Sequence, residues 1–323
     1  MLSAFGWTLA GLVVLIIGSE LLVRGGTRLA ARLGISPTII GLTIVALGTS
    51  APELAVGIEA ALKGSGDLAI GNIAGTNVVN ILFILGLSAS IQSLALRNDT
   101  LRIDLPMIVI ASCALLAMTL DGELTRLDGA LLIAAGVIYT MVLIQAARRE
   151  SRATKLAYAA AQGEPPPPSL GSTLFDTAAL LAGIAIIVVG ADWLVAGAVE
   201  LAKLWGVSDE FIGLTVVAIG TSSPELVTTL VSTIRRQRDI AIGNLLGSSA
   251  YNILIILGVT CVVPSSPIPV APSLIKIDIP VMVAVALACV PVFYSGRQVS
   301  RGEGMLFVAA YLSYLGYLVI VRT

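Results

Sequence analysis

Long apolar stretches separated by short polar ones make up almost the whole chain of 323 residues. A helix needs about 20 mostly apolar residues to cross a bilayer, and ten stretches come close to or exceed that length. The pattern therefore predicts an all-α integral membrane protein with ten transmembrane helices. The predicted helices lie at residues 5–23, 37–62, 68–92, 104–120, 127–147, 174–202, 210–234, 240–263, 273–295 and 303–321.

The two halves of the chain repeat each other. When the sequence is shifted by 172 residues, positions 41–88 align on 213–260 without a gap, with 23 identities in 48 positions. The polar stretch 148–173, with four consecutive prolines, lies between the halves. We therefore divide the chain into a first five-helix repeat, 1–147, a linker, 148–173, and a second five-helix repeat, 174–323. An odd number of helices per repeat gives the two copies opposite orientations, which is the inverted-repeat plan of secondary transporters.

The distribution of Lys and Arg predicts which side of the membrane each connection faces, because cytoplasmic segments carry more basic residues. With the N-terminus outside, 14 of the 19 basic residues fall on the cytoplasmic side. Both termini are then outside and the linker is cytoplasmic, in a multi-pass protein of the plasma (inner) membrane. The exceptions on the outer side are Lys63, Arg126, Lys203, Lys276 and Arg322.

Two predicted helices carry polar residues at their centres. Residues 41–54 read GLTIVALGTSAPEL and residues 213–226 read GLTVVAIGTSSPEL. Proline cannot donate a backbone hydrogen bond, so helices 2 and 7 are expected to break there. A carboxylate at membrane depth costs on the order of 3 kcal/mol. The glutamates Glu53 and Glu225 therefore point to an ion site.

A second polar cluster follows each of these motifs. It reads GNIAGTNVVN at 71–80 and GNLLGSSAYN at 243–252. In each cluster a hydroxyl residue and an asparagine are four positions apart and share a helix face: Thr76 with Asn80, and Ser248 with Asn252. All of these potential ligands are oxygens, which favours hard cations such as Ca²⁺ or Na⁺ over zinc, copper or iron.

Other polar residues have ordinary structural explanations. We expect Glu20 to pair with Arg24 four residues later, and Asp192 to be structural as well. The asparagines Asn72 and Asn244 can form interhelical hydrogen bonds. The hydroxyl residues of the motifs can bond back to helix carbonyls. Asp104 and Asp278, which precede prolines, are expected to cap helices.

Composition excludes several other functions. The chain is 57% hydrophobic and 12% charged, with a net charge of −1 and no histidine. Dispersed basic residues argue against nucleic-acid binding. No nucleophile–base pair or His/Cys metal set indicates an enzyme, and no cofactor is expected. The cysteines are expected to be small buried hydrophobic residues and not disulfides or metal ligands: Cys113, Cys261 and Cys289.

With GTSAPE and GTSSPE, each followed by its GN cluster, the chain resembles the sodium/calcium exchangers of the calcium/cation antiporter superfamily. The resemblance implies that the two glutamates bind both Ca²⁺ and Na⁺, and that Ala46 and Ala218 contribute backbone carbonyls. It also implies that hydroxyl groups complete the sodium sites. Some family members have aspartate where Asn80 or Asn252 stands here. Together with the amide oxygens of the second clusters, the complete candidate ligand set is Glu53, Glu225, Thr49, Ser50, Thr221, Ser222, Thr76, Ser248, Asn80, Asn252, Ala46 and Ala218.

The expected function is antiport of sodium against calcium across the lipid bilayer, with electrogenic extrusion of calcium. Proton/calcium exchange and potassium-dependent sodium/calcium exchange are the alternatives, and a cation channel is a further one. The expected partners are the two ions and the bilayer. We expect a monomer, with a homo-oligomer as the alternative.

Overall fold

The computed structural model describes residues 2–33, 35–149, 170–205 and 218–322. In this part of the chain eight helices are long and apolar enough to span a membrane. A ninth span is obtained if the bent pair Pro37–Thr49 and Ala51–Leu62 counts as one. The prediction of a helical membrane protein is confirmed. The seventh predicted helix, 210–234, begins outside the described residues.

The chain forms two compact units, and each takes segments from both halves of the sequence. Unit 1 comprises Met1–Thr49 and Met141–Asn244, and unit 2 comprises Ser50–Thr140 and Leu245–Thr323. The division into residues 1–147, 148–173 and 174–323 describes the sequence repeat and stays a prediction. Most of the predicted linker lies outside the described residues.

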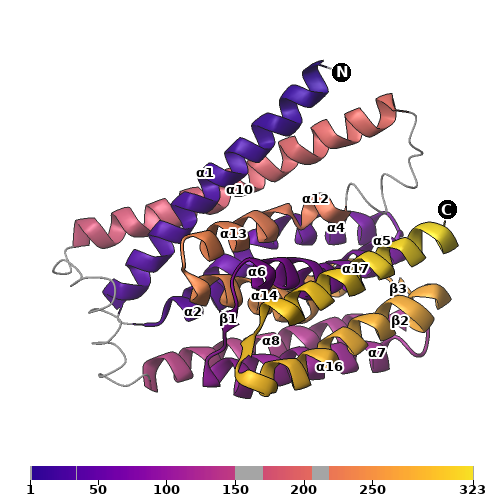
Figure 1. Ribbon diagram of the computed structural model, residues 1–323. Helices are drawn as coiled ribbons and strands as arrows, with labels where there is room; N and C mark the ends of the chain where they lie inside the picture. The colour runs from indigo at the N-terminus through magenta and orange to yellow at the C-terminus, as the bar shows by residue number, and fades with distance from the viewer. Residues whose placement is uncertain (1, 34, 150–169, 206–217, 323) are drawn as a thin grey trace. The chain divides into compact units, whose positions relative to one another are not determined.

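Unit 1 is organised by two long helices, α1 (Leu2–Leu33) and α10 (Leu170–Leu204), which lie side by side and antiparallel (Figure 1). Glycines at intervals of seven residues face the partner helix. A Cβ atom on Gly11 would lie 2.7 Å from the carbonyl oxygen of Gly190, and one on Gly25 would lie 2.8 Å from the backbone nitrogen of Leu180. Only glycine permits backbones to approach so closely, as at other membrane helix interfaces.

The remaining helices of unit 1 pack around this pair. Its apolar core joins Leu22 of α1 and Ile187 of α10 to Val227 and Ile240 from the second half. Near the C-terminal end of α1, Arg32 donates to Asp176 of α10 at 2.5 Å. The other elements with residues in unit 1 are α2 (Pro37–Ile40), η1 (Gly41–Val45), α3 (Ala46–Thr49), the end of α8 (Arg126–Arg149), α12 (Ala218–Thr221), α13 (Ser223–Ile234) and the first part of α14 (Arg238–Tyr251).

Unit 2 contains the rest of the helices, several of which include a π-helical segment, and four two-residue strands that the sequence did not predict. Its first-half elements are α4 (Ala51–Leu62), α5 (Gly66–Val78), η2 (Val79–Leu85), α6 (Gly86–Ile91), β1 (Leu94–Ala95), η3 (Thr100–Asp104), α7 (Leu105–Met118), β2 (Glu123–Leu124) and most of α8. Its second-half elements are the end of α14, η5 (Asn252–Leu257), α15 (Gly258–Val262), β3 (Ile268–Pro269), η6 (Leu274–Asp278), α16 (Ile279–Gly296), β4 (Gln298–Val299) and α17 (Arg301–Arg322).

Contacts within unit 2 recur with the two halves exchanged. Strand β1 pairs antiparallel with β4, and β2 pairs antiparallel with β3. Because β1 and β3 hold equivalent positions in the two repeats, as do β2 and β4, each pairing is the counterpart of the other. The close contact of Gly86 with Gly304 likewise has its counterpart in that of Gly129 with Gly258. A pseudo-two-fold relation between inverted repeats produces this exchange.

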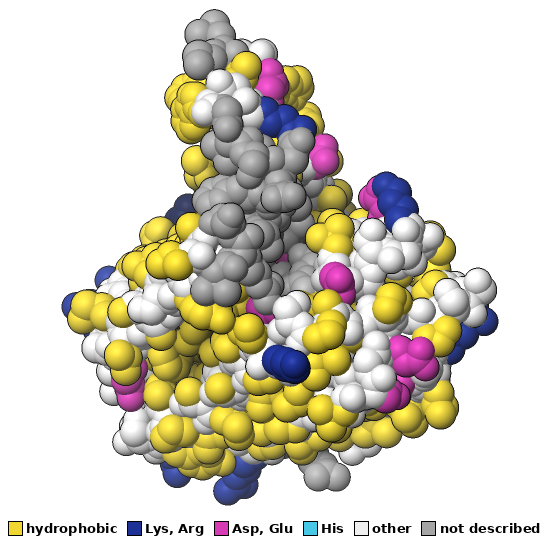
Figure 2. All heavy atoms as spheres, turned by 90° about the vertical axis from the view of Figure 1, so that its right-hand side faces the viewer, with side chains coloured by type: hydrophobic (Ala, Val, Ile, Leu, Met, Phe, Trp, Pro, Cys, Tyr) yellow, Lys and Arg dark blue, Asp and Glu magenta, His cyan; other side chains and the backbone are white. Residues whose placement is uncertain are grey.

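The described surface is largely apolar. On the face shown in Figure 2, hydrophobic side chains predominate and charged ones are scattered. Water would disfavour so extensive an apolar surface, whereas the hydrocarbon of a bilayer accommodates it. Helix α1 alone exposes several large apolar side chains: Phe5, Trp7, Leu9, Leu12, Val13, Ile16 and Ile17. The prediction that all three cysteines are buried is wrong for Cys113, which is exposed, and right for Cys261 and Cys289.

Candidate cation site

The first predicted break lies between α3 and α4. Helix α3 ends at Thr49 and α4 begins at Ala51. The helical stretch Pro37–Thr49, which α3 ends, is bent by 42° from α4. Pro52 in the first turn of α4 has no N–H to donate to the carbonyl of Gly48, and the helix cannot continue undisturbed. The predicted break in helix 2 is therefore present.

The second motif breaks in the same way at Ser222, between α12 and α13. The φ and ψ angles are −82° and 3° at Ser222, and −83° and 11° at Ser50. Pro224 occupies the first turn of α13, as Pro52 does in α4. The preceding residues, 206–217, lie outside the described part of the chain. The repeated sequence thus produces the same local backbone twice.

Both glutamates lie in the first turn of a helix. Glu53 is in the first turn of α4 and Glu225 in the first turn of α13, and neither side chain is exposed to solvent. The N-terminus of a helix carries a partial positive charge, which favours a carboxylate there over one in the helix interior. Each break therefore creates a place where a buried negative charge is tolerated.

In unit 1, hydrogen bonds of the Asn244 side chain connect the end of α3 with α13. The hydroxyl of Thr49 lies 3.1 Å from Oδ1 of Asn244, and 3.3 Å from the carbonyl oxygen of Ala46. Nδ2 of Asn244 donates to Thr229 Oγ1 at 3.1 Å and to the carbonyl of Glu225 at 3.5 Å. The predicted interhelical role of Asn244 is confirmed. Asn244 also positions two motif residues, Thr49 and Glu225.

The spacing of residues in the sequence already indicates that Asn244 faces the other polar residues of its cluster. Asn244 precedes Ser248 by four residues and Asn252 by eight, so all three share one face of a helix. The contact of Asn244 with Thr229 could not be predicted, because the partner lies on another helix and its counterpart in the first repeat is Gly57.

Unit 2 gathers a second set of predicted ligands. Helices α4, α5 and η5 pack against one another, and they carry Glu53, Thr76 and Asn252 respectively. Thr76, Asn80, Ser248 and Asn252 are all buried. The apolar stretches of the spans Gly66–Ile91 and Arg238–Val262 are 72% and 83% buried, compared with at most 44% for the other unbroken spans described. The helices with the second polar cluster are therefore the most enclosed spans described.

Two buried asparagine side chains at equivalent positions have no hydrogen-bond partner in the part of the chain that the structure describes. Within the described residues, neither Oδ1 nor Nδ2 of Asn80 has one, and the same holds for Asn252. Burying a polar group without a hydrogen-bond partner costs about 1–3 kcal/mol. In native proteins such a group usually bonds to a ligand or to water. Amide oxygens at this place fit the expected coordination of a hard cation.

The candidate ligands thus fall into two sets. Unit 1 contains Ala46, Thr49, Ala218, Thr221, Ser222 and Glu225. Unit 2 contains Ser50, Glu53, Thr76, Ser248, Asn80 and Asn252. That all twelve serve one group of cations stays a prediction.

The predicted capping role of two aspartates is wrong. Asp104 and Asp278 occupy N-cap positions, but neither side chain makes a capping hydrogen bond. Asp104 instead accepts a hydrogen bond from Tyr139 at 2.8 Å, and Asp278 accepts one from Tyr314 at 2.9 Å. Each aspartate is the last residue of a π-helical segment, and the N–H of the residue after it already donates to a backbone carbonyl of that segment. The two carboxylates accept hydrogen bonds from other helices instead. The predicted pairing of Glu20 with Arg24 is confirmed.

Comparison with known proteins identifies the family. The model of the family described as "Sodium/calcium exchanger protein" matches residues 3–145 and 175–320. The chain belongs to the sodium/calcium exchanger family. It is 36% identical to the "Putative antiporter CaxA" of Alkalimonas amylolytica, over 97% of this chain and 98% of that protein. It is 34% identical to the "Inner membrane protein YrbG" of Escherichia coli K12, over 98% and 97%.

The fold of this exchanger-family chain also matches a solved structure. The sodium-calcium exchanger NCX_Mj, soaked with 10 mM Na⁺ and zero Ca²⁺, aligns with a TM-score of 0.85 and 27% sequence identity. The alignment covers 98% of this chain and 99% of that one. The helical transporter fold predicted from the sequence is thereby confirmed over almost its whole length.

Proposed function

We propose that this protein exchanges sodium for calcium across the membrane, with sodium entry driving calcium out of the cytoplasm. The observation that carries the proposal is the repeated break: each GTS-x-PE motif ends one helix and starts another with a fully buried glutamate in its first turn. Membership in the exchanger family supports the same conclusion.

In this proposal Glu53 and Glu225 together neutralise one Ca²⁺. The carbonyls of Ala46 and Ala218 and the amide oxygens of Asn80 and Asn252 complete the oxygen ligands. The remaining sites take sodium, with hydroxyl groups as ligands: Thr49, Ser50, Thr76, Thr221, Ser222 and Ser248. Two carboxylates cannot neutralise calcium and a full sodium load at once, because excess positive charge in a low-dielectric site is costly. Mutually exclusive occupancy makes the site an exchanger.

We further propose that exchange is electrogenic. With three Na⁺ for one Ca²⁺, one net charge crosses per cycle. Moving one charge through 100 mV corresponds to ~2.3 kcal/mol, and an inside-negative potential would assist extrusion. The termini are placed outside and residues 148–173 in the cytoplasm of the plasma (inner) membrane, on the basis of the basic residues in the connecting segments.

Flux measurements in proteoliposomes test this function. ⁴⁵Ca²⁺ uptake is measured with an outward gradient of Na⁺, K⁺ or H⁺ imposed in turn, with the membrane potential clamped. We expect uptake to require the sodium gradient and to change with the clamped potential. Uptake driven by the proton gradient alone would instead support proton/calcium exchange, and a strict requirement for potassium together with sodium would support the potassium-dependent alternative.

The same preparation tests the channel alternative. A channel passes calcium down its own gradient with no counter-ion, whereas an exchanger stalls. Calcium uptake in sodium-free liposomes at the rate seen with a sodium gradient would contradict the proposed antiport.

A further inference from the structure

Unit 1 contains a basic cavity between α1 and the connection that follows α13. Its volume is about 380 Å³, and its lining includes three arginines and one carboxylate. Pockets for small molecules typically measure ~300–1,000 Å³. None of the lining residues belongs to the candidate cation site. The lining residues are Glu20, Val23, Arg24, Thr27, Arg28, Arg235 and Gln237.

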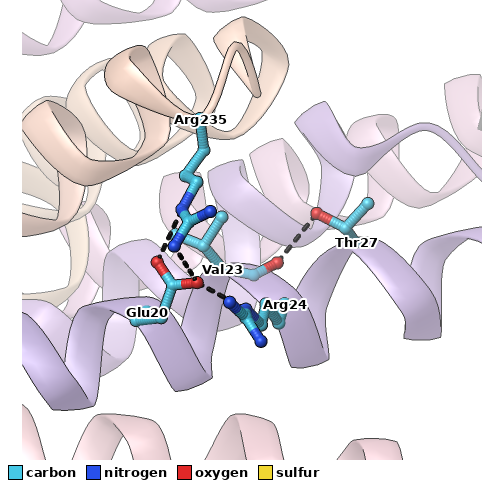
Figure 3. Close-up of polar contacts among 5 residues, drawn as sticks. All are labelled: Glu20, Val23, Arg24, Thr27 and Arg235. Carbon is cyan, nitrogen blue, oxygen red and sulfur yellow. Dashed lines mark hydrogen bonds and ion pairs between the residues drawn. The ribbon is translucent and has the colours of Figure 1, made fainter.

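The charges in this arginine cavity do not balance. Figure 3 shows Glu20 of α1 between Arg24 and Arg235. The guanidinium of Arg235 bonds to both oxygens of Glu20, with Nε at 2.9 Å from Oε2 and Nη2 at 2.7 Å from Oε1. Within the described part of the chain, Arg28 has no hydrogen-bond or ion-pair partner. Three positive charges therefore face one negative charge.

The inverted repeat provides an internal comparison. Positions 172 residues away from Arg24, Arg28 and Arg235 hold Ala196, Glu200 and Lys63. The repeated fold therefore does not require this group of arginines. A general excess of basic residues on the cytoplasmic side explains their number, but it does not explain why three of them line one cavity.

The cavity lies where phosphate groups of lipids are expected. The apolar stretch of α1 ends at Val23, and Arg24 and Arg28 follow on the next two turns of the same helix. A helix residue just beyond an apolar span of this length lies at the level of the headgroups. Arginine presents a planar fork of donors that matches phosphate oxygens, and basic pockets between helices on the cytoplasmic side suit anionic headgroups.

We propose that the arginine cavity binds a phosphate-bearing anion, supplied by an anionic phospholipid headgroup or by free phosphate. Arg28 is the arginine that gains a partner on binding, while Glu20 holds Arg24 and Arg235 in place. The bound anion bridges α1 and Arg235 at the end of α13. Glu225, in the first turn of α13, is ten residues before Arg235, which is about 15 Å along a helix at 1.5 Å per residue. This site is independent of the proposed ion exchange.

Native mass spectrometry of the purified full chain tests the lipid source. The protein is incubated with equal amounts of phosphatidylglycerol and phosphatidylcholine, and the retained lipid is compared. We expect preferential retention of phosphatidylglycerol, reduced about five-fold in Arg28→Gln, the factor that corresponds to ~1 kcal/mol per basic residue near a membrane surface. Arg28→Glu reverses the charge and introduces the residue type that the other repeat has at Glu200. We expect this variant to reduce the retention of phosphatidylglycerol about 25-fold on the same scale.

A matched control is Arg102→Gln. Arg102 is exposed and on the same predicted side of the membrane, but it does not line the cavity. We expect this variant to retain phosphatidylglycerol as the unmodified protein does. Elution as a single peak and an unchanged Tm identify variants that remain folded.

A second arm tests free phosphate. Thermal unfolding is followed in calcium-free buffer with potassium phosphate or with potassium chloride at equal ionic strength. A phosphate-specific rise in Tm that Arg28→Gln abolishes and Arg102→Gln keeps, without preference for phosphatidylglycerol, assigns the site to soluble phosphate. If neither anion binds, or if Arg102→Gln loses as much binding as Arg28→Gln, the proposed site is refuted.

Discussion

Helices α4 and α13 start alike and then diverge. Both begin after a serine at a break, with a proline and a buried glutamate in the first turn. One turn further along, α13 carries Thr228, Thr229, Ser232 and Thr233, all buried, where α4 carries Val56, Gly57, Ala60 and Ala61. The repeat has kept the start of the helix and changed the rest.

The difference follows from what each helix packs against. In α13, Thr228 lies 3.3 Å from the hydroxyl of Ser19, and Thr229 bonds to Asn244. In α4, a Cβ atom on Gly57 would lie 2.7 Å from the hydroxyl of Thr260. One helix uses hydroxyl groups to bond to its neighbours, and the other uses small residues to approach them closely. The shared part of the two helices is therefore the part that we assign to ions.

The largest expected effect concerns the shared glutamates. Glu53→Gln and Glu225→Gln should each lower sodium-driven ⁴⁵Ca²⁺ uptake more than ~100-fold, because removing one buried charge from a paired site costs about 3–5 kcal/mol. Purification yield and Tm check that the variants fold. The proposed equivalence of the two helices fails if one variant keeps normal uptake.

Glu59→Gln is the matched control for that experiment. Glu59 is on α4 as well, but it is exposed and pairs with Lys63 at 2.5 Å. Exposed ion pairs contribute at most about 1 kcal/mol, so this variant should retain uptake within a factor of two.

A smaller effect separates the two asparagines that begin the GN clusters. Asn244→Ala should lower the free energy of unfolding by about 1–3 kcal/mol, because it leaves buried hydroxyl groups without their amide partner. Asn72→Ala should change it by less than about 0.5 kcal/mol, because Asn72 is partly exposed and its Nδ2 has no partner among the described residues. Reversible unfolding in mixed detergent micelles measures both. Equal losses would show that the Asn244 hydrogen bonds contribute no net stability.

The smallest effect concerns the turns that follow α4 and α13. Gly64 has φ 74°, and its counterpart Arg236 has φ 60°. Left-handed backbone costs a residue with a side chain about 1 kcal/mol relative to glycine. Arg236→Gly should therefore raise the free energy of unfolding by about 1 kcal/mol, and Gly64→Ala should lower it by a similar amount. Shifts of the same sign in the two variants would show that backbone strain does not decide these turns.

The sequence by itself determined the helices, the breaks and the repeat. These features depend on local properties: apolar length decides which segments can cross a bilayer, and a proline interrupts a helix whatever surrounds it. The repeated glutamates and hydroxyl residues could be identified because carboxylates are rare in apolar segments. The predicted placement of those residues in one cation site remains to be tested.

Only the tertiary structure decided which distant groups meet. The partners of Asn244, the tyrosines that bond to Asp104 and Asp278, and the pairing of the two-residue strands all join segments far apart in the sequence. An asparagine or aspartate can satisfy its hydrogen bonds in many ways, so its type and local spacing do not select one partner. The selection is made by packing, which brings a particular donor within reach of a particular acceptor.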